Sequence, residues 1–188
     1  MTRSGSESCD SQSRAPFHTL DQIERVEIHT HESALRIIDK TGPLHNPADR
    51  DHCLQYMTAS GLIFGALTAD HYEDVTAADR LDALRAKMVV REDPRYTREY
   101  LEPDKRAIAN AVQIFFRDGR ATEKVEVEYP LGHRRRRTEG IPLLVEKFQA
   151  NAETCFPPTR VANILARFED VKGLERSAVD EFVTGFLA

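Results

Sequence analysis

Asn46-Pro-Ala-Asp-Arg-Asp-His-Cys-Leu-Gln-Tyr56 opens a segment rich in small and apolar residues that continues to Leu67. Asn46 or Asp49 can cap a helix, and Pro47 suits a first helical turn. The apolar body that follows indicates that this helix packs inside the fold. We therefore predict a buried helix from about Pro47 to Leu67, with polar residues gathered at its start.

Three polar side chains near the start of this segment favour proton transfer. His52 and Tyr56 are four residues apart, so on one helix they would lie on the same face. With Arg50 nearby, an imidazole and a phenol in this arrangement can polarise or protonate a carboxylate-bearing substrate. The alternative is structural, because histidines and tyrosines near a helix start commonly satisfy hydrogen bonds within the fold. The spacing alone leaves both interpretations open.

The segment before this helix alternates in the manner of a β-strand. Between residues 23 and 30, Val26 and Ile28 face one side, whereas Glu27 and His29 face the other. Residues 33–38 either extend the strand or form a short helix. The alternation therefore predicts a strand with one apolar and one polar side.

The pattern between this helix and the next strong β signal predicts short elements. A helix starts at 68–72, and a second helix at 77–86 is capped by Thr76, with Leu81 and Leu84 inward. A strand follows at 87–91. Turns are predicted at 41–43, 93–95 and 102–104. Each of these elements is short enough to belong to one compact domain.

A hairpin is the clearest β signal downstream. Residues 107–117 and 122–129 flank Asp118-Gly119, a strong turn sequence. The second strand alternates between two sets of side chains. Val125, Val127 and Tyr129 face one side, and the charged residues Lys124, Glu126 and Glu128 face water. Four strands in mostly antiparallel pairing, with helices on one face, predict an α+β domain. Helices at about 140–151, 158–168 and 178–187 complete the chain.

Composition indicates a soluble globular protein. The chain has 188 residues, of which 40% are hydrophobic and 30% charged. A net charge of −5 argues against a general nucleic-acid binder. No apolar run approaches the roughly 20 residues that span a bilayer. The N-terminus lacks the apolar core of a secretory signal, and three scattered cysteines give no disulfide framework. We therefore predict a cytoplasmic protein with no nucleic-acid or membrane partner.

Two further places hold groups that suit anions. Gly132-His-Arg-Arg-Arg-Arg137 offers arginine forks that match carboxylates, and His133 and Arg134 are the members expected to point inward. The alternative is a solvated basic run between domains. Lys40 also suits an anion, with an ordinary surface turn as its alternative.

Metal and nucleotide chemistry find little support in the sequence. His29-x-His31 is half of a possible metal site, but no third or fourth ligand is suitably spaced. The chain contains no glycine-rich phosphate loop and no G-x-S-x-G elbow. We predict neither a metal nor any other cofactor.

The segment 46–56 resembles the corresponding segment of the MmgE/PrpD family. The similarity extends to further stretches on both sides: Asp21–Pro43, Leu62–Tyr72, Asp104–Ala111, Val127–Arg137 and Gly140–Phe148. Together these motifs cover about residues 20–188.

The resemblance implies a hydro-lyase that removes water from 2-methylcitrate, a small tricarboxylic acid, during propionate breakdown through the methylcitrate cycle. It implies that Tyr56 lines the active site and assigns weaker roles to His52 and Arg50. It also implies catalysis without an iron–sulfur cluster, which fits the three unspaced cysteines. Full-length members begin with a large helical domain that carries most of the catalytic residues, and this chain resembles only their C-terminal portion.

The resemblance also implies a domain plan. It consists of an α+β lid-like domain at 18–137 and a C-terminal helical segment at 138–188, preceded by a tail at 1–17 whose serine-rich, polar composition predicts disorder. The helical segment would pack on the helical domain, and without that domain its apolar side chains would stay exposed: Leu143, Leu144, Phe148, Phe182 and Phe186. The expected partner is a second copy or the helical domain in trans. The alternatives are a non-catalytic lid or dimerisation module and a related activity such as aconitate decarboxylation.

Overall fold

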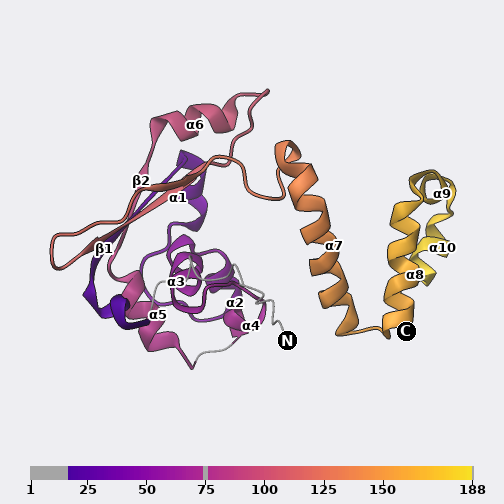
Figure 1. Cartoon of the computed structure of the whole chain (residues 1–188), viewed down its shortest axis with the longest axis horizontal. Helices are drawn as coiled ribbons and strands as arrows, with labels where there is room; N and C mark the ends of the chain where they lie inside the picture. Colours follow the sequence, from indigo (N-terminus) through magenta and orange to yellow (C-terminus); the bar gives the residue numbers. More distant parts are fainter. Residues whose placement is uncertain (1–16, 74–75, 188) are drawn as a thin grey trace, which may run out of the picture. The chain divides into compact units, whose positions relative to one another are not determined.

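The computed structural model describes residues 17–73 and 76–187 of the chain (Figure 1). They divide into two compact units, one ending at Glu128 and the other beginning at Tyr129. The division falls before the arginine run, whereas the sequence placed it after Arg137. Residues 1–16, which make up most of the expected tail, lie outside the described residues.

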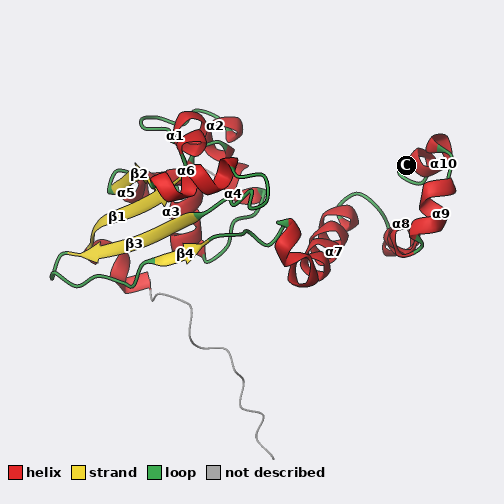
Figure 2. Cartoon of the chain, turned by 90° about the horizontal axis from the view of Figure 1, so that it is seen from above, coloured by secondary structure: helices red, strands yellow, loops and turns green. Residues whose placement is uncertain are grey.

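The first unit is built on a four-stranded sheet with the order β2-β1-β3-β4. The strands are β1 (Ile23–Thr30), β2 (Met88–Glu92), β3 (Asn110–Phe116) and β4 (Val125–Val127). β1 pairs with β2 in parallel and with β3 antiparallel, and β3 pairs antiparallel with β4 (Figure 2). The predicted α+β class with mostly antiparallel pairing is confirmed.

The core lies between this sheet and two helices, α3 (Leu54–Phe64) and α5 (Ala78–Arg85). Val26 and Ile28 are buried on the helix side of β1, which is the apolar side that the alternation predicted. Leu81 and Leu84 of α5 pack into the same cluster, which confirms their inward orientation. α3 and α5 therefore fix the position of the loops that join them to the sheet.

The long helix predicted from Pro47 to Leu67 is wrong, because the chain forms two helices there. α2 (Pro47–Asp51) has His52 as its C-cap, and α3 begins after Cys53, whose backbone is extended with ψ 109°. Cys53 is fully buried at this break, so packing of its side chain accompanies the change in backbone direction. α3 then ends at Gly65, which has a positive φ of 73°.

The caps at the starts of the helices agree with the sequence in one case and differ in another. Asn46 accepts a hydrogen bond from the backbone N–H of Asp49 at 2.8 Å, as a helix cap should. At α5 the N-cap position belongs to Ala77, so the prediction that Thr76 caps this helix is wrong.

The remaining elements of the first unit are short. They are the 3-10 helix η1 (Phe17–Gln22), α1 (Glu32–Ile38), α4 (Asp70–Glu73) and α6 (Pro94–Leu101). α1 resolves the alternative left open for residues 33–38 in favour of a helix. Its N-cap is His31, whose ring accepts from the N–H of Ala34 and stacks on Tyr100 of α6 at 4.3 Å.

The predicted hairpin is confirmed around Asp118-Gly119, where Gly119 has a positive φ of 84°. β4 is shorter than predicted, and Val125 and Val127 are 64% and 45% exposed. The expectation that only the charged side of this strand faces water is therefore wrong. β4 lies at the sheet edge, beyond the strands that α3 and α5 cover.

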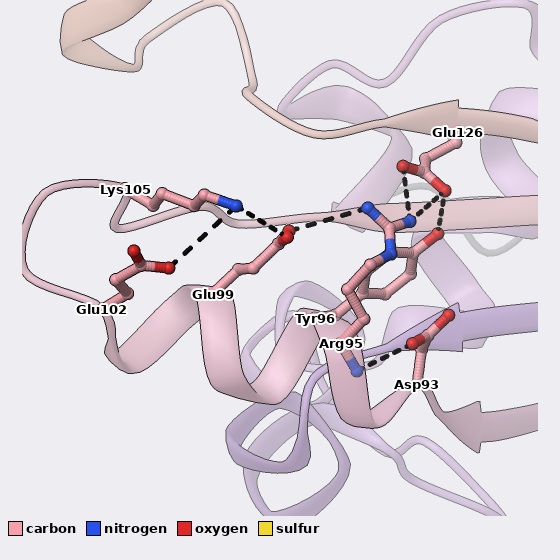
Figure 3. A network of polar contacts seen from close by, with 7 residues as sticks. All are labelled: Asp93, Arg95, Tyr96, Glu99, Glu102, Lys105 and Glu126. Carbon is pink, nitrogen blue, oxygen red and sulfur yellow. Dashed lines mark hydrogen bonds and ion pairs between the residues drawn. The ribbon is translucent and has the colours of Figure 1, made fainter.

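Glu126 of β4 turns toward α6 instead of facing water alone (Figure 3). The Nη2 atom of Arg95 donates to both of its carboxylate oxygens, at 2.7 and 2.6 Å, and the hydroxyl of Tyr96 donates to one of them at 2.5 Å. These donors hold the pKa of Glu126 below its ordinary value, with Arg95 the larger cause. Burial, together with Glu126, raises the pKa of Tyr96. This network fastens the edge strand to α6.

The second unit is helical. It contains the 3-10 helix η2 (Arg134–Arg136) and the helices α7 (Arg137–Glu153), α8 (Pro158–Glu169), α9 (Val171–Arg176) and α10 (Val179–Thr184). Leu143 and Leu144 are exposed, as expected. The same expectation is wrong for Phe148, Phe182 and Phe186, which are half-buried and in contact with other phenylalanine rings.

Candidate functional site

Two of the predicted site residues meet at the short helix α4. The Nη1 atom of Arg50, from α2, donates to the carbonyl of Tyr72 at 2.5 Å. The hydroxyl of Tyr56, from α3, donates to the carbonyl of His71, also at 2.5 Å. The rings of Tyr56 and Tyr72 stack with centroids 6.1 Å apart. Burial raises the pKa of Tyr72, and the nearby Asp51 and Tyr56 add to that shift.

His52 does not join this group. The break between α2 and α3 removes the shared helical face on which the pairing with Tyr56 depended. The His52 side chain is 59% exposed and is hydrogen-bonded to the carboxylate of Asp51, whereas Tyr56 is only 4% exposed. The predicted alignment of His52 and Tyr56 is therefore wrong.

Lys40 lies in a different place from the α4 contacts. Its Nζ atom is 3.6 Å from a carboxylate oxygen of Asp49. The backbone N–H of His45 and, to a smaller extent, Lys40 hold the pKa of Asp49 below its ordinary value. Lys40 also lines a cavity of about 470 Å³. This location is compatible with the contact to an anion that the sequence suggested.

The cavity is formed by one turn, two helices and one strand. Its lining comes from the turn after α1, from α3, from α5 and the residue after it, and from the start of β2: Lys40, Thr41, Gly42, Pro43, Gln55, Asp82, Arg85, Ala86 and Met88. Arg85 is buried, and it ties α5 to the turn because its Nη2 atom donates to the carbonyl of Gly42 at 3.0 Å. Gln55 donates to the carboxylate of Asp39.

Sequence reasoning missed Arg85 and Gln55. Arg85 follows Leu81 by four residues and Leu84 by one, so it falls on the buried face of α5. An arginine on an apolar helix face is rarely buried without a partner, and this was the available signal. Gln55 offered no such signal. The predicted unbroken helix gave the wrong set of inward-facing positions, because the chain breaks before α3.

The arginine run lies in the second unit. His133 is half-buried, accepts from the N–H of Arg135 at 3.1 Å, and lies against the ring of Tyr129 at 4.6 Å. Arg134 is exposed, so its predicted inward orientation is wrong. Arg136 folds back instead, donating to the carbonyl of Tyr129 and pairing with Glu139. The arginine run is thus held mainly by contacts within its own unit.

Within residues 17–73 and 76–187, no three histidine, cysteine, aspartate or glutamate side chains gather closely enough to hold a metal ion. Across the same residues, no helix has both the length and the apolar character needed to cross a bilayer.

Comparison with known proteins points to one family. The model of the MmgE/PrpD C-terminal domain matches residues 9–171. A 2-methylcitrate dehydratase from Cupriavidus necator is 56% identical over 162 residues, covering 86% of this chain and 34% of the relative. One from Salmonella typhimurium is 53% identical over 173 residues, covering 92% and 36%.

The similarity also reaches a eukaryotic protein. A relative from Yarrowia lipolytica, named 2-methylcitrate dehydratase, mitochondrial, is 52% identical over 167 residues, with 88% of this chain and 32% of the relative covered. The chain therefore spans about a third of the length of the curated relatives that it matches.

Proposed function

The chain belongs to the MmgE/PrpD family, in its C-terminal domain, and from that premise we propose that it contributes to a 2-methylcitrate dehydratase. This hydro-lyase removes water from 2-methylcitrate to give 2-methylaconitate in the methylcitrate cycle of propionate catabolism. The observation that carries the proposal is the identity of more than half of the aligned residues with relatives that bear this name.

The chemistry of dehydration defines which groups the site needs. A proton alpha to a carboxylate must leave, the departing hydroxyl must be protonated, and cations must hold the carboxylates of the substrate. In our proposal the hydroxyl of Tyr56 donates the proton to the leaving group, exchanging its present bond to the carbonyl of His71 for one to the substrate. His52 supports proton exchange at the rim of the site, where its exposure leaves it open to solvent.

We assign the carboxylates of the substrate to Arg50 and Lys40 of the first unit. In the second unit, taken by itself, we propose His133 and Arg134 as groups that can bind a carboxylate. Arg50 supports this role through its position beside Tyr56 at α4, and Lys40 supports it through its place in the cavity. The general base is assigned to the part of the relatives that this chain does not match.

The same proposal covers cofactor, partner and location. We assign no cofactor, because proton transfer and carboxylate binding account for the reaction. The proposed partner is a second copy of the chain or the remaining portion of a family member supplied in trans. We propose a cytoplasmic location; cell fractionation tests it, since the name of the Yarrowia relative specifies mitochondria.

A chimera tests the proposed activity. The region of the Salmonella relative that matches this chain is replaced by the present sequence, and the product is purified with a chelator present. We expect it to dehydrate 2-methylcitrate, followed through the ultraviolet absorbance of the new conjugated double bond. The chain alone is assayed in parallel, since its activity would place the base within these 188 residues.

The alternatives give different results in the same experiment. A folded chimera that releases carbon dioxide from aconitate, and leaves 2-methylcitrate unchanged, would support the decarboxylase alternative. A folded chimera with neither activity would overturn the dehydratase proposal and favour a lid or dimerisation module. Circular dichroism and size-exclusion chromatography establish in each case that the chimera is folded.

A further inference from the structure

Arg85 is a buried cation whose hydrogen-bonding capacity is only partly used. Its side chain is 7% exposed, and it lies on α5 at the wall of the cavity described above. One terminal nitrogen pairs with Asp82 and the other donates to the carbonyl of Gly42. Its Nε atom is buried and has no hydrogen-bond partner. A buried donor without an acceptor is destabilising, so this site would gain from an added acceptor.

The charges around the cavity favour an anion over a cation. Among the lining residues two are cations, Arg85 and Lys40, and one is a carboxylate, Asp82. Asp82 is 60% exposed, so its hold on Arg85 is weakened by solvent and can be exchanged for a ligand. The Nζ atom of Lys40 is 3.6 Å from a carboxylate oxygen of Asp49, which is long for a charge-assisted hydrogen bond.

We propose that this cavity binds a small carboxylic acid between Lys40 and Arg85. A carboxylate matches the planar guanidinium of Arg85 better than a spherical ion does, because two oxygens can accept from neighbouring nitrogens. Lys40 supplies a second positive charge from the turn after α1.

The apolar part of the lining selects for a ligand with a carbon skeleton. Pro43, Ala86 and Met88 line the cavity beside the two cations. A carboxylic acid covers such surface with its methylene groups, whose burial is favourable. Inorganic phosphate shares the oxyanion chemistry but has no carbon to place there. We therefore expect citrate to bind more tightly than phosphate.

This inference rests on the proposed function only through Lys40. The proposed function assigns Lys40 to a carboxylate of the substrate, and the inference assigns it to a carboxylate of the bound acid. Gln55 lines the cavity, whereas the next residue, Tyr56, turns its hydroxyl to α4. The inference concerns binding alone, so its test measures binding and needs no turnover. Loss of the dehydratase activity in the chimera would leave it intact, whereas absence of citrate binding would remove only the role that the proposed function assigns to Lys40.

Binding of citrate to the purified 188-residue chain is measured by calorimetry and by the methyl resonances of labelled methionines. We expect the Met88 methyl to shift, because Met88 lines the cavity, and the Met57 methyl of α3 to stay in place. Inorganic phosphate, used as the second probe, should bind at least tenfold more weakly, which corresponds to 1.4 kcal/mol.

Substitutions separate this site from general electrostatic attraction. Lys40→Gln should weaken citrate binding about tenfold, the effect of one charge-assisted hydrogen bond. Asp82→Asn should tighten it, because Asp82 competes with the ligand for Arg85. Arg80→Gln, at an exposed position of the same helix, is the matched control and should leave the affinity unchanged.

Four outcomes would overturn the inference. They are no binding of citrate, binding without a shift of Met88, equal affinity for phosphate, and equal weakening by Lys40→Gln and Arg80→Gln. The first two come from the unmodified chain and so do not depend on how any variant folds.

Discussion

Arg50 and Tyr56 donate hydrogen bonds to the carbonyls of two consecutive residues. Arg50 donates to Tyr72 and Tyr56 to His71, and the donor–acceptor distance is 2.5 Å in both. The two donors come from separate helices, α2 and α3, so both helices hold the short helix α4 (Asp70–Glu73) through its two middle residues. A four-residue helix has little stability of its own. The position of α4 therefore depends on the same two side chains that we propose for the chemistry.

Tyr56→Phe separates the catalytic role of this hydroxyl from its structural role. In the chimera we expect turnover to fall about a hundredfold or more, as for loss of a general acid. Loss of the bond to His71 should cost only about 1 kcal/mol of unfolding free energy. Tyr72→Phe, the same change on the stacked neighbouring ring, is the control and should keep turnover within a few-fold. Unchanged turnover in the Tyr56 variant would remove Tyr56 from the site.

His31 makes the first unit less stable in weak acid. Burial lowers the pKa of His31 from its ordinary value of 6.5, so the unfolded chain takes up this proton at a higher pH than the folded one. The contribution of His31 to stability is thus complete above pH 6.5 and falls as the pH drops toward the lowered value. Urea unfolding at about pH 7.5 and about pH 5.5 should show this loss.

His31→Asn is the matched variant for that measurement. Asparagine can still accept from the N–H of Ala34 at the cap, but it has no titratable ring to stack on Tyr100. We expect this variant to be less stable at the higher pH and to lose part of the dependence on pH. An unaltered pH dependence would show that other groups cause it.

Glu126→Gln should loosen the edge strand β4. The substitution keeps the shape of the side chain but removes the charge that accepts from Arg95 and Tyr96. Because the pKa of Glu126 is lowered, its contribution is present above the ordinary value and disappears as the pH falls through the lowered one. We expect a loss of about 1 kcal/mol near pH 7, since the pair is partly exposed.

The control for this variant is Glu123→Gln, at an exposed position before β4. It removes the same charge and should change stability by less than about 0.5 kcal/mol. Hydrogen exchange of the β3 and β4 amides at about pH 7 and about pH 3 reports the difference locally. A difference between wild type and Glu126→Gln that is as large at the lower pH would contradict the assignment to charge.

The sequence predicted the parts of the fold that local pattern determines. The alternation at Val26 and Ile28 identified β1, and Asp118-Gly119 identified the hairpin. The break at Cys53 was missed, since burial of that side chain depends on contacts distant in the chain. The pairing of His52 with Tyr56 failed for the same reason, because it assumed an unbroken helix.

The candidate site was also predicted only in part. Arg50 and Tyr56 were predicted from one motif and do come together, although at α4, which the motif does not contain. Arg85 was missed because one of its partners, the carbonyl of Gly42, lies on a turn far from α5 in the chain. Local sequence indicated which chemical groups matter, and long-range packing determined which of them meet.

Two glycines inside helices should respond to alanine with opposite signs. At Gly140 of α7, an added Cβ would lie 2.1 Å from the carbonyl oxygen of Leu131, which belongs to the backbone and cannot move aside cheaply. At Gly61 of α3, an added Cβ meets nothing within 4 Å. Alanine stabilises a helix interior by about 1 kcal/mol relative to glycine. We therefore expect Gly61→Ala to stabilise α3 by roughly that amount.

Gly140→Ala should destabilise α7 in spite of the same helical preference, because the close contact outweighs it. Hydrogen exchange of peptides from α3 and α7 measures each change in its own helix, so independent unfolding of the two units does not confuse the comparison. Stabilisation of both helices would mean that the chain before α7 moves aside to admit a methyl group. Destabilisation of both would mean that α3 packs more tightly at Gly61 than the open space around its Cα indicates.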